Sequence, residues 1–164
     1  MSPCLVPADS PLGQLKGGTN MVVLEGDAVE QVVLRGPGAG EGPTASAVMG
    51  DVCDVARGLR ISTFGVPAAE LTAAQAATSN SPAPYYVRLD LLDRPGALAK
   101  LATALGDAGV SIDRMRQRQH DGTAAPVLIV THKTQRSAVN DAIELMRESG
   151  VMASEPVALR IETL

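Results

Sequence analysis

The 164-residue sequence predicts an α+β fold in two parts: a complete domain over residues 85–164 and, before it, an incomplete α/β segment. In the C-terminal half, stretches of alternating apolar and polar residues, typical of strands, are separated by stretches with apolar residues at i, i+3, i+4 and i+7, typical of helices. The resulting order is strand, helix, strand, strand, helix, strand. This βαββαβ order predicts a ferredoxin-like fold, with both helices on one face of an antiparallel sheet.

Each element of this domain has its own signal. The first strand, Tyr85 to Leu91, ends at the turn residues 93–96, and Gly150 ends the second helix. The other strands are expected at 110–119, 126–131 and 157–161, with a hairpin turn at Asp121-Gly122. The apolar stripes of the two helices consist of Leu98, Leu101, Ala102 and Leu105, and of Val139, Ala142, Ile143 and Met146.

The N-terminal half predicts a hairpin, a Gly-rich loop and one helix. Residues 20–25 and 29–35 read as two strands joined by a turn at Gly26-Asp27. The loop, residues 36–43, precedes a helix expected from Thr44, as its N-cap, to Arg57. The apolar stripe of this helix consists of Val48, Val52 and Val55.

The Gly-rich loop has two interpretations. A loop of this kind that runs into a helix N-terminus suits contact with a phosphate or a cofactor. It also suits a plain connector, because glycine tolerates most backbone conformations. Its spacing matches neither G-x-G-x-x-G nor a P-loop with its lysine, so the segment does not encode a nucleotide-binding domain by itself.

Residues 61–84 are expected to be a linker. The run 73–84 consists mainly of Ala, Ser, Thr, Asn and Pro and has no apolar period, although residues 67–77 have the composition for a short Ala-rich helix. The predicted boundaries are therefore 1–60 for the incomplete segment, 61–84 for the linker and 85–164 for the complete domain.

Composition excludes several classes of function. Fourteen Lys and Arg against 18 Asp and Glu give a net charge of −4, and aromatics are only 2%, so neither the charge nor the stacking surface of a nucleic-acid-binding protein is present. Cys4 and Cys53 form no disulfide framework and no metal-ligand spacing. With no long apolar run and no signal-peptide pattern at the N-terminus, we expect a soluble cytoplasmic protein without a metal.

The turn Asp93-Arg94-Pro95-Gly96 is the candidate site of the C-terminal domain. Gly96 permits a positive φ or a close backbone approach, and the following helix N-terminus offers N–H groups to a carboxylate. Such a turn suits the α-carboxylate of an amino acid, with Asp93 taking the ammonium group or a hydroxyl. The same residues also suit a tight turn with a solvated aspartate.

The run 93–99, followed by 105–112 with its Gly-Val-Ser-Ile start of a strand, resembles an ACT domain. The resemblance implies a sensor of a small effector, usually an amino acid, and side-by-side pairing of two domains with effectors at the interface. It therefore implies a homodimer. Carried over residue by residue, it places the effector site at Asp93, Gly96, Ala97, Leu98 and Ile112.

The N-terminal half resembles the end of the catalytic region of homoserine dehydrogenase. The motifs that carry this resemblance, in one order, are Pro7-Ala8-Asp9-Ser10-Pro11-Leu12, Gly18-Thr19-Asn20-Met21-Val22, Glu25-Gly26-Asp27-Ala28, and Gly36-Pro37-Gly38-Ala39-Gly40 with residues 43–48 after it. Bacterial forms of that enzyme often carry an ACT domain at this place.

This second resemblance implies an oxidoreductase of threonine and methionine biosynthesis. The family interconverts L-aspartate 4-semialdehyde and L-homoserine with NAD(P)H, and its ACT domain is associated with allosteric threonine feedback. It places Gly38, Ala39 and Gly40 against the nicotinamide cofactor, and it packs the following helix on the nucleotide-binding domain.

The sequence also departs from the family. The Rossmann fingerprint, the catalytic lysine, the substrate-binding acidic residues and the metal-binding loop all lie upstream of this stretch in the family. Lys16, Lys100 and Lys133 do not match the lysine motif, and His120 and His132 are expected to be surface residues. No catalytic residue is assigned, and we expect the isolated chain to bind no cofactor and catalyse no turnover.

Three hypotheses follow. The chain is a C-terminal fragment of homoserine dehydrogenase, or a stand-alone amino-acid sensor built on the ACT half. Alternatively, it docks onto a separately encoded N-terminal half of the enzyme.

Overall fold

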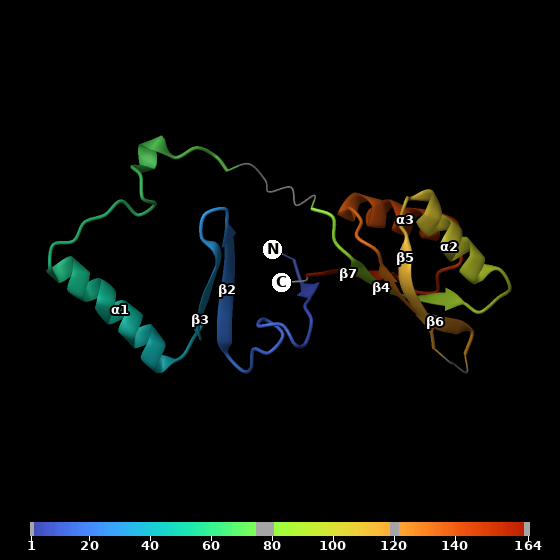
Figure 1. Ribbon diagram of the computed structural model, residues 1–164, viewed down its shortest axis with the longest axis horizontal. Coiled ribbons are helices and arrows are strands. Elements are labelled where there is room, and N and C mark those ends of the chain that lie inside the picture. The colour runs from blue at the N-terminus through green and yellow to red at the C-terminus, as the bar shows by residue number, and fades with distance from the viewer. Residues whose placement is uncertain (1, 75–80, 119–121, 163–164) are drawn as a thin grey trace. The chain divides into compact units, whose positions relative to one another are not determined.

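A five-stranded sheet covered by two helices forms the larger of two units in the chain (Figure 1). The structure, a computed structural model, describes residues 2–74, 81–118 and 122–162. The larger unit groups the first ten residues with the chain from residue 78 onward, and the smaller unit spans Pro11–Ala77. The elements in chain order are β1 (Cys4–Leu5), β2 (Thr19–Gly26), β3 (Glu30–Pro37), α1 (Glu41–Ala56), the 3₁₀ helix η1 (Ala68–Glu70), β4 (Tyr85–Leu92), α2 (Ala97–Asp107), β5 (Ile112–Gln117), β6 (Ala124–Thr131), α3 (Arg136–Glu148) and β7 (Val157–Ile161).

The βαββαβ order predicted for the C-terminal half is confirmed. The strands lie in the order β1-β7-β4-β6-β5, and the pairs β7–β4, β4–β6 and β6–β5 are antiparallel. Every second residue of β4 and β6 is buried, so one face of the sheet forms the core with α2 and α3 (Figure 1). The largest fully buried side chains are Tyr85, Leu89, Leu101, Leu105, Ile129 and Met146.

The predicted helix stripes are correct except at one position. Leu101, Leu105 and the α3 residues Val139, Ala142 and Met146 are buried, and Leu98 and Ile143 pack at the margin of the core. Ala102 is exposed, and Ala104 is buried in its place. Successive helical residues are about 100° apart, so residue 102 turns away from a face centred on Leu101 and Leu105.

β1 is an element that the sequence does not reveal. It pairs in parallel with β7, in the register Cys4 to Arg160 and Leu5 to Ile161, and the N–H of Glu162 donates to the carbonyl of Leu5 at 2.8 Å. A two-residue strand carries no periodic signal, because alternation needs at least four residues to be visible. Residues assigned by sequence to the N-terminal segment thus complete the sheet of the C-terminal unit.

Two side-chain hydroxyl groups form hydrogen bonds with backbone groups inside this unit. The Oγ1 of Thr131, a residue only 1% exposed, accepts a hydrogen bond from the Tyr85 N–H at 2.9 Å and donates to the carbonyl of His132 at 2.8 Å. The Oγ of Ser154 accepts from the Asp90 N–H and donates to the Asp90 carboxylate at 2.9 Å. The bonds of Thr131 to Tyr85 and of Ser154 to Asp90 connect segments far apart in the sequence, so they hold these segments in register.

An exposed ion-pair cluster joins the end of α3 to the segment before β7. Arg147 pairs with Glu144 and, through its Nη2, with Glu155 at 2.7 Å. The hydrogen bonds from Arg147 lower the pKa of the Glu155 carboxyl, against a smaller opposing effect of desolvation.

This cluster predicts a pH dependence of stability. Because the folded pKa of Glu155 lies below its unfolded value, its contribution is complete above the unfolded pKa and is lost as the pH falls through the folded pKa. We expect Glu155→Gln to reduce the drop in melting temperature between about pH 5 and pH 3, measured by circular dichroism. Glu148→Gln, at an exposed glutamate at the end of α3, is the control. Equal drops for wild type and Glu155→Gln would contradict the prediction.

The smaller unit contains the predicted hairpin and helix. β2 and β3 pair antiparallel from Thr19–Pro37 to Gly26–Glu30, which confirms the hairpin with slightly longer strands than predicted. α1 begins at Glu41 with Gly40 as its N-cap, so the prediction of Thr44 as N-cap is wrong. Pro43 causes no break, because proline lacks only an N–H that has no partner in the first turn of a helix.

The apolar stripe of α1 is exposed in the structure. Val48, Val52 and Val55 are 55%, 52% and 74% exposed, and none of the residues of α1 is buried. A helix with an exposed apolar stripe normally packs against another element in the folded protein. The smaller unit as described therefore leaves an apolar helix face uncovered.

The described part of the linker between the two predicted halves contains little regular structure. Within residues 61–74 and 81–84 the structure has only the three-residue η1 in place of the predicted Ala-rich helix. His120, and Asp121 of the predicted hairpin turn Asp121-Gly122, lie outside the described residues. Both cysteines are free and exposed. No helix in the described part of the chain is long and apolar enough to cross a membrane.

Candidate functional site

The turn between β4 and α2 has the geometry that its sequence predicts. Gly96, at the N-cap of α2, has φ +84° and ψ −7°, the left-handed conformation that glycine adopts without strain. No side chain of the described residues caps this helix N-terminus. A Cβ added at Gly96 would meet nothing within 4 Å, so the turn lies beside open space. The Ala97 N–H donates to the Arg94 carbonyl at 3.2 Å, so the N–H groups of Leu98 and Ala99 are the ones at the start of α2 that an anionic group could contact.

Three hydrogen bonds hold this turn in place. The Asp93 N–H donates to the Thr123 carbonyl at 2.8 Å, and the Leu92 N–H donates to the Val151 carbonyl at 2.9 Å. The Arg94 guanidinium donates to the carbonyl of Gly150 at 2.8 Å, beyond the C-terminus of α3. The turn is thus held by the β6 side of the sheet and by the end of α3.

The structure groups four of the five predicted effector positions. Asp93 and Gly96 are exposed at the turn, Ala97 is 5% exposed and belongs to the core, and Leu98 is half-buried at its margin. These four residues lie within six positions of the chain and form one local site.

Ile112, the fifth predicted position, lies at the other end of the sheet. It pairs with Thr131, whereas Leu92, next to the turn, pairs with Ala124. Seven residues along β6 separate these pairings, which corresponds to about 23 Å at the usual rise per strand residue. A single chain therefore does not bring Ile112 to the turn.

The predicted cofactor loop connects β3 to α1. Gly38 donates its N–H to the Gly18 carbonyl at 3.2 Å, and a Cβ at Gly38 would lie 1.8 Å from the amide nitrogen of Asn20. The two motifs that contain Gly18 and Gly38 are thus neighbours. Position 38 has no room for a side chain, because the side chain of Asn20 occupies that space.

Gly40 sets the direction of α1. Its φ of +131° and ψ of 158° are accessible essentially only to glycine, and its carbonyl accepts the first helical bond, from Thr44, at 3.0 Å. The start of α1 carries the acidic Glu41, and a shallow hollow of about 540 Å³ lies over residues 40–49. Its lining is Gly40, Glu41, Thr44, Ala45, Val48 and Met49.

No metal centre is found in the described residues: no three His, Cys, Asp or Glu side chains there lie close enough to share an ion. The turn at Gly96 and the loop at Gly40 are the two candidate sites that the sequence predicts. The pairing of β1 with β7 is not predicted from the sequence.

Residues 85–148, which contain the ferredoxin-like elements from β4 to α3 and the glycine turn, match the ACT domain family. Residues 1–53 match the homoserine dehydrogenase family. Across 98–99% of its length, this chain is similar to homoserine dehydrogenases from Pseudomonas aeruginosa (33% identity) and Corynebacterium glutamicum (32% identity). The chain spans 39% and 36% of the length of these two relatives.

Solved structures agree with this relationship. A homoserine dehydrogenase from Thiobacillus denitrificans matches 98% of this chain with a TM-score of 0.76 and 30% identity, and 38% of that chain is covered. A Staphylococcus aureus homoserine dehydrogenase, at 18% identity and a TM-score of 0.53, shares the fold over 97% of this chain and 36% of its own. The chain corresponds to the C-terminal portion of a homoserine dehydrogenase and includes its regulatory ACT domain.

Proposed function

We propose that this chain supplies the cofactor-side edge and the feedback domain of a homoserine dehydrogenase. That enzyme interconverts L-homoserine and L-aspartate 4-semialdehyde with NAD(P)(H), on the route to threonine and methionine. The observation that carries the proposal is the continuous similarity over 98–99% of the chain, which includes both units in one order.

The loop at Gly38, Ala39 and Gly40 is proposed to lie against the nicotinamide ring of the cofactor. Gly40 carries no side chain, so its backbone can approach a flat ring closely. Glu41 in the first turn of α1 disfavours a phosphate group there, because like charges repel at a helix N-terminus as elsewhere. The loop therefore suits the ring better than the pyrophosphate, and bound cofactor would supply the hydride.

The isolated chain is expected to show no turnover with homoserine and NAD(P), because none of its described residues is assigned the proton transfer that the reaction needs. Absorbance of the reduced nicotinamide measures this directly. The same assay with the catalytic region of a relative added as a separate polypeptide distinguishes a chain that complements a partner from one that does not. Normal turnover by the 164 residues alone would contradict the assignment.

The turn at Gly96 is proposed as the effector site for an amino acid, with threonine as the first candidate. The N–H groups at the start of α2 suit the α-carboxylate, and Asp93, exposed at the same turn, is proposed to take the ammonium or a hydroxyl group of the ligand.

A homodimer through β5 is proposed to bring Ile112 nearer to this site. β5 lies at one edge of the sheet and runs from Ile112, at the far end, to Gln117, whose partner Val127 lies toward the turn. Two copies that pair antiparallel through β5 would place the partner subunit's Ile112 opposite Gln117, at the turn end of the sheet. Such a two-fold pair would reduce the separation along the strands between Ile112 and the turn from about 23 Å to about 10 Å, with β5 and β6 between them.

We expect Gly96→Val to weaken threonine binding by roughly tenfold or more, measured by isothermal titration calorimetry. A β-branched residue is strained at φ +84°, so the turn must rearrange and the N–H groups of α2 lose their common direction. The space beside Gly96 is open, so the effect comes from the backbone and not from a clash.

Two variants serve as controls for this prediction. Gly96→Asn retains the left-handed conformation at modest cost and should retain most of the binding. Gly58→Val introduces the same strain at φ +81° in the other unit and should leave binding unchanged. Equal affinities for wild type and Gly96→Val would exclude the turn as the effector site.

A stand-alone amino-acid sensor is the second candidate function, because the C-terminal unit has a complete hydrophobic core of its own. This candidate predicts threonine binding without any effect of the chain on dehydrogenase activity. The complementation assay above separates the two functions.

A further inference from the structure

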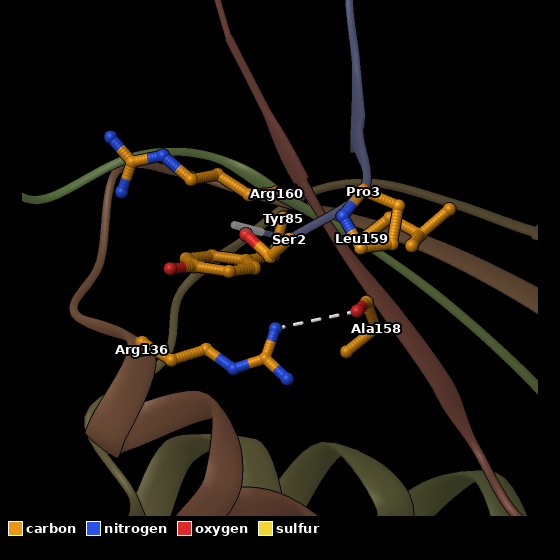
Figure 2. Close-up of a pocket in the computed structure, with 7 residues that line it drawn as sticks. All are labelled: Ser2, Pro3, Tyr85, Arg136, Ala158, Leu159 and Arg160. Atoms are coloured by element: carbon orange, nitrogen blue, oxygen red, sulfur yellow. Dashed lines mark hydrogen bonds between the residues drawn. The ribbon is translucent and has the colours of Figure 1, made fainter. Parts of the chain in front are cut away.

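A cavity lies at the opposite end of β4 from the effector turn. It has a volume of about 370 Å³ and is bounded by the N-terminal segment, the start of β4, the start of α3 and the end of β7 (Figure 2). Ser2 and Pro3 form one wall, and Tyr85, Arg136, Leu159 and Arg160 form the others. β4 separates Tyr85 from Leu92 by seven residues, or about 23 Å, so this cavity is distinct from the turn.

Two guanidinium groups flank the ring of Tyr85 in this cavity (Figure 2). Arg160 is already neutralised: it forms an ion pair with Glu162 and donates to the Ser81 carbonyl at 2.7 Å. Arg136 is different. Its guanidinium carbon lies 5.7 Å from the centre of the Tyr85 ring, and its Nη1 donates to the Ala158 carbonyl at 3.3 Å. No carboxylate in the described part of the chain forms an ion pair with Arg136.

The other walls of the cavity are largely apolar. The ring of Pro3 and the side chain of Leu159 contribute apolar surface beside the cation, whereas the ring of Tyr85, a residue only 1% exposed, lies between the two arginine side chains (Figure 2). A guanidinium group binds a carboxylate with two parallel hydrogen bonds, and an adjacent apolar wall adds contact area for the body of the same molecule. The volume is at the small end of the range of ligand pockets.

We propose that this cavity binds a small carboxylate with a compact apolar body, the carboxylate on Arg136 and the body against Pro3 and Leu159. Arg136 is exposed to solvent, which screens the charge, so the affinity is modest, with a Kd of about 1 mM. This site is independent of the proposed dehydrogenase function and of the turn at Gly96.

Ligand binding here is coupled to the docking of β1. Ser2 and Pro3 directly precede β1, so one wall of the cavity exists only while β1 pairs with β7. A ligand that contacts this wall binds the docked state more tightly and therefore shifts the equilibrium toward it.

The test is a titration of the full chain with benzoate, followed by ¹H–¹⁵N NMR, with uncharged benzamide as the matched probe. We expect benzoate to shift the amide signals of Ser2, Tyr85 and Leu159 with a Kd of about 1 mM, and benzamide to bind roughly tenfold more weakly or not at all. Equal binding of the two probes, or shifts confined to residues 93–98, would overturn the proposal.

Substitutions of Arg136 test whether its positive charge binds the carboxylate of benzoate. Arg136→Gln should weaken benzoate binding roughly tenfold, whereas Arg114→Gln, on β5 at the opposite edge of the sheet, should leave it unchanged. Arg136→Lys retains the positive charge without the planar fork, so an intermediate affinity is expected, and it replaces Arg136→Gln if that variant does not fold. Wild-type affinity in both variants of Arg136 would also overturn the proposal.

Hydrogen exchange measures the coupling between benzoate binding and the pairing of β1 with β7. The Glu162 N–H is bonded to Leu5 of β1, so benzoate should slow hydrogen exchange at this amide, and deletion of residues 2–5 should weaken benzoate binding. An exchange rate at Glu162 that saturating benzoate does not change would refute the coupling.

Discussion

Leu101→Ala is expected to lower the free energy of unfolding of the larger unit by about 3 kcal/mol. Leu101 is fully buried in α2, where the helix packs on the sheet and on α3. Truncation of a buried leucine removes its favourable transfer from water and leaves a cavity that the surrounding side chains fill only in part. The total free energy of unfolding of a domain of this size is about 5–10 kcal/mol, so this change is a large fraction of it.

Tyrosine fluorescence during urea unfolding measures this change in the full chain. The protein has no Trp, and its two tyrosines, Tyr85 and Tyr86, both lie on β4, so their emission reports on this unit alone. Met115→Ala, at a β5 side chain that is 44% exposed, should cost less than about 1 kcal/mol. A loss at Leu101→Ala no larger than at Met115→Ala would show that α2 does not pack on the sheet as described.

Thr131→Val is expected to cost about 2 kcal/mol, although the two side chains have nearly the same shape. The substitution removes the hydroxyl that accepts from the buried Tyr85 N–H, and this N–H then has no acceptor at the start of β4. A buried donor without a partner loses its hydration and gains nothing in return. Burial of the added methyl group offsets part of this cost.

Thr131→Ser separates the hydroxyl from the methyl group. Serine retains the acceptor for Tyr85 and loses only one methyl group, so its cost should be about 1 kcal/mol. The same fluorescence measurement applies. If Thr131→Val is as stable as wild type, the hydrogen bond to Tyr85 contributes nothing to the register of the sheet.

The sequence predicts the C-terminal domain well because its signals are periodic and local. Alternation on β4 and the α2 stripe around Leu101 and Leu105 each depend on residues within one element. Gly96 is predictable for a similar reason, since a Pro-Gly turn before a helix needs a left-handed residue. The exposed Ala102 shows the limit of this method: alanine fits either face, so its side is decided by the neighbouring leucines.

Features that depend on distant contacts are not predictable in this way. β1 exists as a strand only because β7 lies beside it, and Cys4 and Leu5 alone carry no pattern. The separation of Ile112 from the turn likewise follows from the strand register. The start of α1 at Glu41 results from the conformation of Gly40, which the tolerant sequence Gly-Ala-Gly does not specify.

The pairing of β1 with β7 has a consequence for the order of synthesis. Cys4 and its partner Arg160 are 156 residues apart in the chain. At ordinary rates of translation, roughly 10 to 30 s pass between the synthesis of one and that of the other. During this interval β1 has no strand to join, and contacts of such high sequence separation form late in folding. The strands β4, β5 and β6 can therefore pair with one another during this interval, and β1 joins the sheet only after β7 has been synthesised.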